Sequence, residues 1–99
     1  MIRGTTPTLH FTLPFEVSSL AEAYISLSQN GEVVVEKQLQ DCTADKTELS
    51  VRLTQEETLK LLHGFHTEIQ VRARTLSGDA LASNIIAVKT DRILKDGVI

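Results

Sequence analysis

Residues 54–74, TQEETLKLLHGFHTEIQVRAR, contain a helix start, a glycine stop and a long alternating strand. Thr54 and Glu57 have the spacing of a capping box, in which each side chain accepts a hydrogen bond from the backbone N–H of the other residue. Gly64 can adopt the left-handed conformation that ends a helix. Three apolar residues lie between these signals: Leu59, Leu61 and Leu62. The spacing predicts one short helix over about residues 55–62.

A strict alternation begins directly after this helix. Ile69, Val71 and Ala73 share one face of an extended chain, and the residues between them are polar. This pattern is typical of a strand that buries one face and exposes the other. A helix of about eight residues is marginal on its own, so it must be held by tertiary packing. We interpret residues 54–74 as a corner that bridges two sheets, and we expect no reaction centre there.

Further alternating segments lie on either side of this stretch. They cover residues 8–13, 23–29, 32–39, 47–53 and 80–90. Asn30-Gly31 between two of them is a strong signal for a tight hairpin turn. The segment 80–90 is apolar on both faces, which indicates a strand that is either central or covered by a partner. About six strands without a helix long enough for a parallel crossover predict an all-β antiparallel sandwich.

Length and composition fit one soluble domain spanning residues 1–99. The chain is 41% hydrophobic and 23% charged, with a formal charge of −3. Its acids outnumber its dispersed bases, so we expect no nucleic-acid partner. The apolar runs are too short to span a bilayer, and MIRGTTPTLHF lacks the apolar core of a signal peptide. We therefore expect no membrane association and a cytoplasmic product.

The chain offers little reactive or metal-binding chemistry. His63 and His66 form an H-x-x-H pair with His10 as the third histidine, but zinc needs three or four converging ligands. We expect solvated imidazoles and no metal site. Cys42 is the only cysteine, and its acidic neighbours should raise its pKa, so we expect a half-buried filler near a turn. No nucleotide-binding or hydrolase motif occurs. We expect neither enzymatic activity nor a cofactor.

Two groups of residues are candidates for partner binding. Arg72 and Arg74 lie on one strand face about 7 Å apart and could bind a carboxylate, or could pair with acids of a neighbouring strand. The C-terminal tail, residues 91–99, carries apolar side chains after the last strand: Ile93, Leu94, Val98 and Ile99. This tail must either fold back over the sandwich or reach onto a neighbouring subunit.

The order of these segments resembles a known family. IRGTTPTLHFTLP, LTQEETLKL and TEIQVRARTLSGDALASNIIAVKTDRILKDG are similar to small phage and prophage proteins of Gram-positive bacteria. The layout resembles the immunoglobulin-like N-terminal domain of phage upper-baseplate proteins, although the later receptor-side and trimerisation regions of those proteins have no counterpart here. The resemblance implies an immunoglobulin-like sandwich and carries no catalytic residues.

The resemblance favours a non-enzymatic structural or assembly protein of a phage or prophage. It would act by protein–protein docking, either to copies of itself as a homo-oligomer or to other particle proteins, and would be cytoplasmic when synthesised and then virion-associated. The alternative is a stand-alone β-sandwich module that binds a host protein or a carbohydrate. A carbohydrate site usually needs exposed aromatic residues, and the chain has no Trp and one Tyr.

Overall fold

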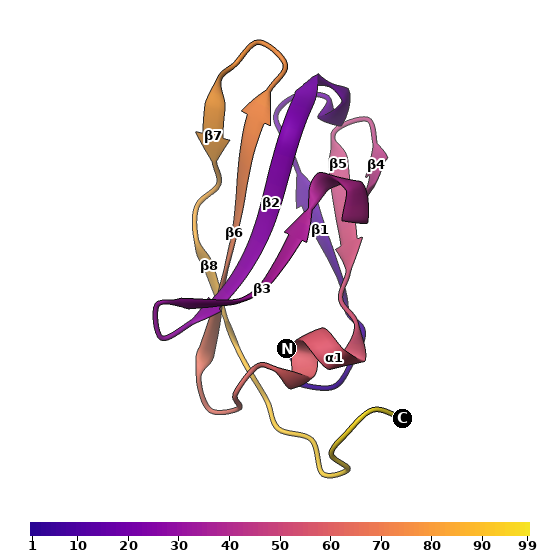
Figure 1. Ribbon diagram of the computed structural model, residues 1–99, viewed down its shortest axis with the longest axis vertical. Helices are drawn as coiled ribbons and strands as arrows, with labels where there is room; N and C mark the ends of the chain where they lie inside the picture. Colours follow the sequence, from indigo (N-terminus) through magenta and orange to yellow (C-terminus); the bar gives the residue numbers. More distant parts are fainter.

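Side-chain alternation builds the strands of the computed structural model, which describes residues 1–99. Two antiparallel sheets pack face to face, and a short helix closes one end of the sandwich (Figure 1). The elements in chain order are β1 (Thr8–Thr12), η1 (Val17–Ser19), β2 (Leu20–Gln29), β3 (Glu32–Gln38), η2 (Leu39–Asp41), β4 (Thr43–Asp45), β5 (Glu48–Arg52), α1 (Gln55–Leu59), β6 (His66–Thr75), β7 (Ala80–Ala82) and β8 (Ile86–Lys89). The predicted all-β antiparallel sandwich with one short corner helix is confirmed.

The strand order is that of an immunoglobulin-like sandwich with a much reduced first strand. The smaller sheet has the order β1-β5-β4, and the larger has β3-β2-β6 followed by β7 and β8. These correspond to strands B-E-D and C′-C-F-G of the immunoglobulin arrangement, in which a strand A pairs with strand B. Here the N-terminal segment makes only one parallel bridge, between Ile2 and Asp91. Consequently β1 has no strand on its outer side.

The core lies between β2 and β6 on one side and β5 on the other. The aliphatic alternation of these strands supplies most of the buried side chains, and the loop after α1 adds Leu61. The core residues below 3% exposure are Ala23, Ile25, Leu27, Leu49, Val51, Leu53 and Leu61. None of the helical segments has the length and apolar character needed to cross a membrane.

The corner helix is shorter than the sequence predicts. The capping box is confirmed: the Thr54 hydroxyl accepts from the Glu57 N–H at 3.1 Å, and the Glu57 carboxylate accepts from the Thr54 N–H at 2.8 Å. However, α1 ends at Leu59. The Leu61 N–H bonds to the Thr58 carbonyl at 3.2 Å and the Leu62 N–H bonds to the Gln29 side chain at 2.8 Å, whereas a helix continuing to residue 62 would direct these N–H groups to the carbonyls four residues earlier. The Arg3 guanidinium binds the carbonyls of Leu59 at 2.8 Å and Leu61 at 2.7 Å, which have no helical partner.

The segment 80–90 does not form one continuous strand. It divides into β7 and β8, because Ser83 bonds to Val71 through both its N–H, at 2.8 Å, and its hydroxyl, at 3.0 Å. Both strands pair with β6 alone, so they form an edge of the larger sheet. Of the two alternatives that the sequence offered, the central strand is therefore wrong, and a strand covered by a partner stays a prediction. The segment after η2 also contributes the short edge strand β4.

A half-buried ion pair ties the helix to the larger sheet. The Lys37 ammonium lies 2.9 Å from the Glu57 carboxylate, and the two side chains are 14% and 19% exposed. Burial acts to raise the pKa of Glu57. Hydrogen bonds from Lys37 and the Thr54 N–H, together with the Lys37 charge, outweigh that effect, so this pKa lies below its ordinary value. Because folding depresses this pKa, the pair stabilises the protein above the ordinary Glu range, and that contribution is lost as pH falls through the folded pKa.

Lys37→Met is therefore expected to lower the free energy of unfolding by about 1–3 kcal/mol at neutral pH, since it leaves a half-buried carboxylate without its cation. The difference from wild type should narrow below the ordinary Glu pKa. Urea unfolding across a pH series measures both effects. Lys89→Met removes an exposed pair with Asp91, 3.9 Å long, and should cost no more than about 0.5 kcal/mol. Equal losses of stability in Lys37→Met and Lys89→Met would contradict a stabilising role for the Lys37–Glu57 pair.

Candidate functional site

Two unpaired sheet edges lie on the same side of the sandwich. One edge is β1 and the other is formed by β7 and β8; we call the surface between them the open side. A groove of about 260 Å³ lies there between the end of β1 and the larger sheet. Seven of its ten lining residues are hydrophobic, among them Leu13, Phe15 and Leu81. The open side is therefore an apolar surface bordered by two strand edges.

The smaller sheet does not cover the last strand of the larger one. Ile86 of β8 pairs with Ile69 of β6, so both side chains point toward the smaller sheet. Ile69 is 6% exposed, whereas Ile86 is 55% exposed. Leu81 of β7, paired with the half-buried Ala73, is 38% exposed. The inner face of β7 and β8 thus extends beyond the cover that β1 provides.

The C-terminal tail folds back on its own domain, which is one of the two outcomes expected from the sequence. The Ile99 N–H and carbonyl bond to the Gln55 side-chain amide at 2.9 and 3.2 Å. The half-buried Ile93 packs beside Gly4. The other predicted docking residues remain outside: Leu94 is 91% exposed, Val98 54% and Ile99 90%. Ile93 therefore packs within its own domain, while Leu94, Val98 and Ile99 present apolar side chains to solvent.

Arg72 and Arg74 lie on the outer face of the larger sheet, as expected. The Arg74 guanidinium lies 3.7 Å from the Glu22 carboxylate on β2, which is the cross-strand pairing that the sequence offered as one reading. Arg72 pairs in register with Tyr24 and makes no ion pair. Both arginines stay accessible, and neither lies on the open side.

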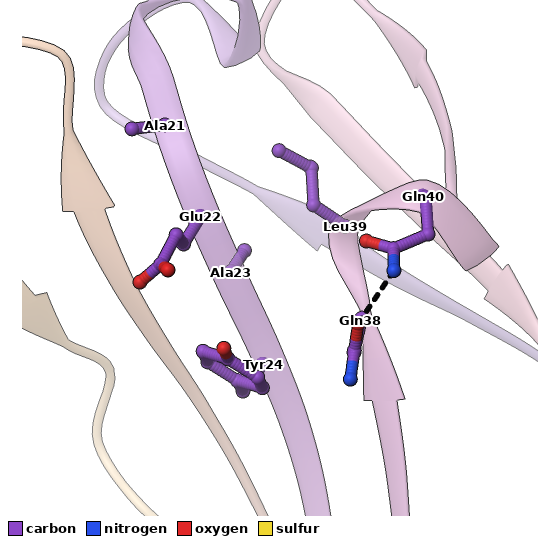
Figure 2. A pocket seen from close by; sticks show the side chains of 7 residues that line it. All are labelled: Ala21, Glu22, Ala23, Tyr24, Gln38, Leu39 and Gln40. Carbon is purple, nitrogen blue, oxygen red and sulfur yellow. Dashed lines mark hydrogen bonds between the residues drawn. The ribbon is translucent and has the colours of Figure 1, made fainter.

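A shallow pocket lies beside these residues, between the upper part of β2 and the junction of β3 with η2. Figure 2 shows the Glu22 carboxylate and the Tyr24 ring on β2, and the amides of Gln38 and Gln40 joined by a hydrogen bond. The lining residues supply one carboxylate, one phenol and two amides. A single carboxylate without a paired base or nucleophile provides hydrogen-bonding capacity but no assembled general acid and base.

The three histidines do not come together. His10 lies on β1, where its Nδ1 contacts Glu48 at 3.0 Å and Ser50 at 2.9 Å. No group of three or more His, Cys, Asp or Glu side chains is placed to hold a metal ion. His63 and His66 are both exposed, on either side of the Gly64 turn.

Cys42 is half-buried after η2, as the sequence suggested. Its thiol donates to the Gln38 carbonyl at 3.4 Å. Burial raises the pKa of this thiol, and the Asp41 charge adds to the effect, while Lys37 opposes it. The direction agrees with the sequence-based expectation, but burial contributes more than the acidic neighbours. A thiol with a raised pKa is a poor nucleophile at neutral pH.

Reasoning from sequence missed the open side as a site. A signal for it was present, because no charged residue occurs from Ala80 to Val88. The same run is equally typical of a central or partner-covered strand, and only its pairing with β6 alone places it at an edge. Comparison with protein-family models, with curated proteins and with solved structures gave no match for this chain.

Proposed function

We propose that this chain is a non-enzymatic structural or assembly protein of a phage or prophage, which acts by docking to other proteins. The observation that carries the docking role is the ordered C-terminal tail with exposed apolar side chains, in which Leu94 and Ile99 are 91% and 90% exposed. The resemblance in the order of its segments supports the phage origin. Synthesis in the cytoplasm followed by incorporation into a virion is the location that this role requires.

The tail is suited to docking because it is positioned before a partner arrives. The Gln55 amide bonds and the packing of Ile93 against Gly4 fix its path. A segment that is already ordered loses less conformational entropy on binding than a free tail does. Full burial of an aliphatic side chain is worth about 1.5–3 kcal/mol, so the three exposed side chains can anchor an interface. Arg72, which has no ion pair, can add a polar contact to a partner carboxylate.

Replacing Leu94, Val98 and Ile99 together by Ser should weaken binding to a particle protein at least tenfold, through the loss of buried apolar area. The substitutions leave Ile93 and the backbone bonds to Gln55 in place, so the domain should keep its stability. The measurement is co-expression with the products of the neighbouring genes, followed by titration calorimetry on the complex that forms. A tail or capsid protein is the expected partner.

Val33→Ser is the matched control, because Val33 is 53% exposed on β3 and Val98 is 54% exposed in the tail. It should leave the affinity unchanged. The proposed function fails if no neighbouring gene product binds, and the tail assignment fails if the triple variant binds as tightly as wild type. Binding to a glycan or to a host protein through the pocket of Figure 2 would instead support the stand-alone binding module.

A further inference from the structure

We propose that the open side is a homodimer interface in which β8 of each copy pairs with β1 of the other. The exposed inner faces of β7 and β8 of the two copies then pack on each other, and we call this arrangement the lap joint. The inference rests on the proposed docking function, because it names a second copy of this chain as one of the partners. It concerns a surface separate from the C-terminal tail.

The four sheet edges of the molecule differ in how they are protected. Charged residues, especially Lys, and very short strands are common defences against edge-to-edge pairing. On β3 the outer edge carries Glu32, Glu36 and Lys37, and β4 is only three residues long and ends in Asp45. By contrast, β7 and β8 carry no charge before Lys89, and the only titratable side chain on β1 is His10. The two edges that lack charged protection are the two that border the open side, where β7 shares with β4 only its length of three residues.

The backbone of β1 has free hydrogen-bonding groups at its outer edge. The Leu53 N–H bonds to the Pro7 carbonyl at 2.9 Å, and the Leu13 N–H bonds to the Thr47 carbonyl at 2.8 Å. Bonded and non-bonded positions alternate in an antiparallel pair, so the residues at odd positions point their backbone groups at β5. Those of Thr12 and of the other residues at even positions point away from the sheet.

The same reasoning applies to β8. The Thr90 N–H bonds to the Phe65 carbonyl at 3.1 Å, so Ile86 and Val88 direct their backbone groups at β6. Those of Ala87 and the Lys89 N–H point away, whereas the outward Lys89 carbonyl accepts from the Met1 amino group at 2.6 Å. Each copy therefore offers one free row of donors and acceptors on β1 and a shorter one, centred on Ala87, on β8.

Strand direction and side-chain placement match across such a pair. β1 runs antiparallel to β5, α1 joins β5 to β6 at one end of the sandwich, and β8 runs antiparallel to β6, so β8 runs opposite to β1 (Figure 1). A two-fold axis along the strands preserves these directions, so that β1 meets the partner's β8 as an antiparallel pair. It also stacks the two inner faces on each other, which places Ile86 and Leu81 of one copy over the same residues of the other. No two like charges meet in this core.

The first test compares two adjacent isoleucines of equal exposure. Ile86 is 55% exposed on the inner face of β8, and Ile85, which is 57% exposed, precedes it and should point to the opposite face by alternation. Wild type should sediment with a mass about twice 10.9 kDa. Ile86→Lys should raise the dimer dissociation constant at least tenfold, and Ile85→Lys should not. A wild type that stays at the mass of one chain at every concentration would overturn the proposal, as would equal effects of the two variants.

The second test uses proline at the two free edges. Proline is tolerated on an edge strand where the N–H faces solvent, so Thr12→Pro and Ala87→Pro should keep the circular dichroism spectrum of wild type. Both should dissociate the dimer, because the lap joint uses both rows. Dissociation by Ala87→Pro alone would show that β8 pairs with β8 and would overturn the lap joint. If either proline variant unfolds, hydrogen exchange of wild type at high and low protein concentration replaces it: the amides of Thr12 and Ala87 should be protected only at high concentration, and unprotected amides would overturn the proposal.

The two proposals fail separately. The triple Ser variant of the tail should remain a dimer, and Ile86→Lys should still bind a particle protein through the tail. A dimer without any particle partner would refute the proposed function alone. A monomer that binds such a partner would refute the lap joint alone.

Discussion

Gln29→Leu is expected to lower the free energy of unfolding by about 2–4 kcal/mol, because it leaves several buried polar groups without partners. The Gln29 side chain is 4% exposed. Its amide nitrogen donates to the Leu62 carbonyl at 2.9 Å and to the Thr67 hydroxyl at 3.2 Å, and its carbonyl oxygen accepts from the Leu62 N–H at 2.8 Å. Leucine has a similar size but offers none of these bonds.

The loss should extend beyond the substituted residue. The hydroxyl of Thr67 also lies 2.6 Å from that of Thr90, so the amide of Gln29 connects β2, the loop after α1, β6 and the end of β8. Urea unfolding gives the overall effect, and hydrogen exchange of the Leu62 amide reports the local one. Gln40→Leu is the control, since Gln40 is exposed on η2 and should change stability by less than about 0.5 kcal/mol. Similar losses in both variants would show that Gln29 is not a structural link.

Gly4→Val is also expected to lower the free energy of unfolding by about 2–4 kcal/mol, for two separate reasons. Gly4 has a φ of +73°, which is strained for a β-branched residue, and a Cβ there would lie 2.8 Å from Ile93 Cδ1 and 3.2 Å from Leu59 Cδ2. The substitution should therefore push Ile93 from its position and release the start of the tail. Denaturant unfolding measures the loss of stability, and the Ile93 methyl shift in NMR spectra measures the displacement of Ile93.

Gly97→Val separates strain from crowding. Gly97 has a φ of +86°, and a Cβ at this position would have no other residue within 4 Å, so that variant carries the backbone strain alone. Gly97→Val should lower the free energy of unfolding by about 1–2 kcal/mol and leave the Ile93 methyl shift unchanged. If Gly4→Val matches Gly97→Val in both measurements, the packing of Ile93 against Gly4 does not hold the tail.

Local signals predicted the elements well where a few neighbouring residues determine the structure. The Thr54 and Glu57 capping box and the left-handed Gly64 could be expected from spacing alone, and both are present. The length of the helix could not, since the Leu62 N–H bonds to the side chain of Gln29, which lies more than thirty residues away, instead of to a helix carbonyl. Leu62, expected on the apolar side, is 55% exposed.

The candidate surfaces also depend on contacts between distant residues, which local sequence signals cannot predict. Sequence identified Ile93, Leu94, Val98 and Ile99 as apolar residues in need of burial, but only the placement of Gly4 decides that Ile93 alone packs inside. For the open side, alternation cannot say which strand pairs at an edge. The Ser83 hydroxyl accepts from the Val71 N–H in place of a strand carbonyl, which divides segment 80–90 into two strands. The alternation of apolar and polar residues does not predict this side-chain bond.

The charged outer edge of β3 and the short outer edge of β4 would limit the size of the proposed assembly. In the proposed dimer, β3 and β4 lie at the outer ends of the joined sheets, and both resist further pairing. Growth would therefore stop at two chains, whereas a copy with an uncharged β3 would offer a new template at each end and would polymerise into fibres. The acids of β3 would thus prevent polymerisation of the dimer.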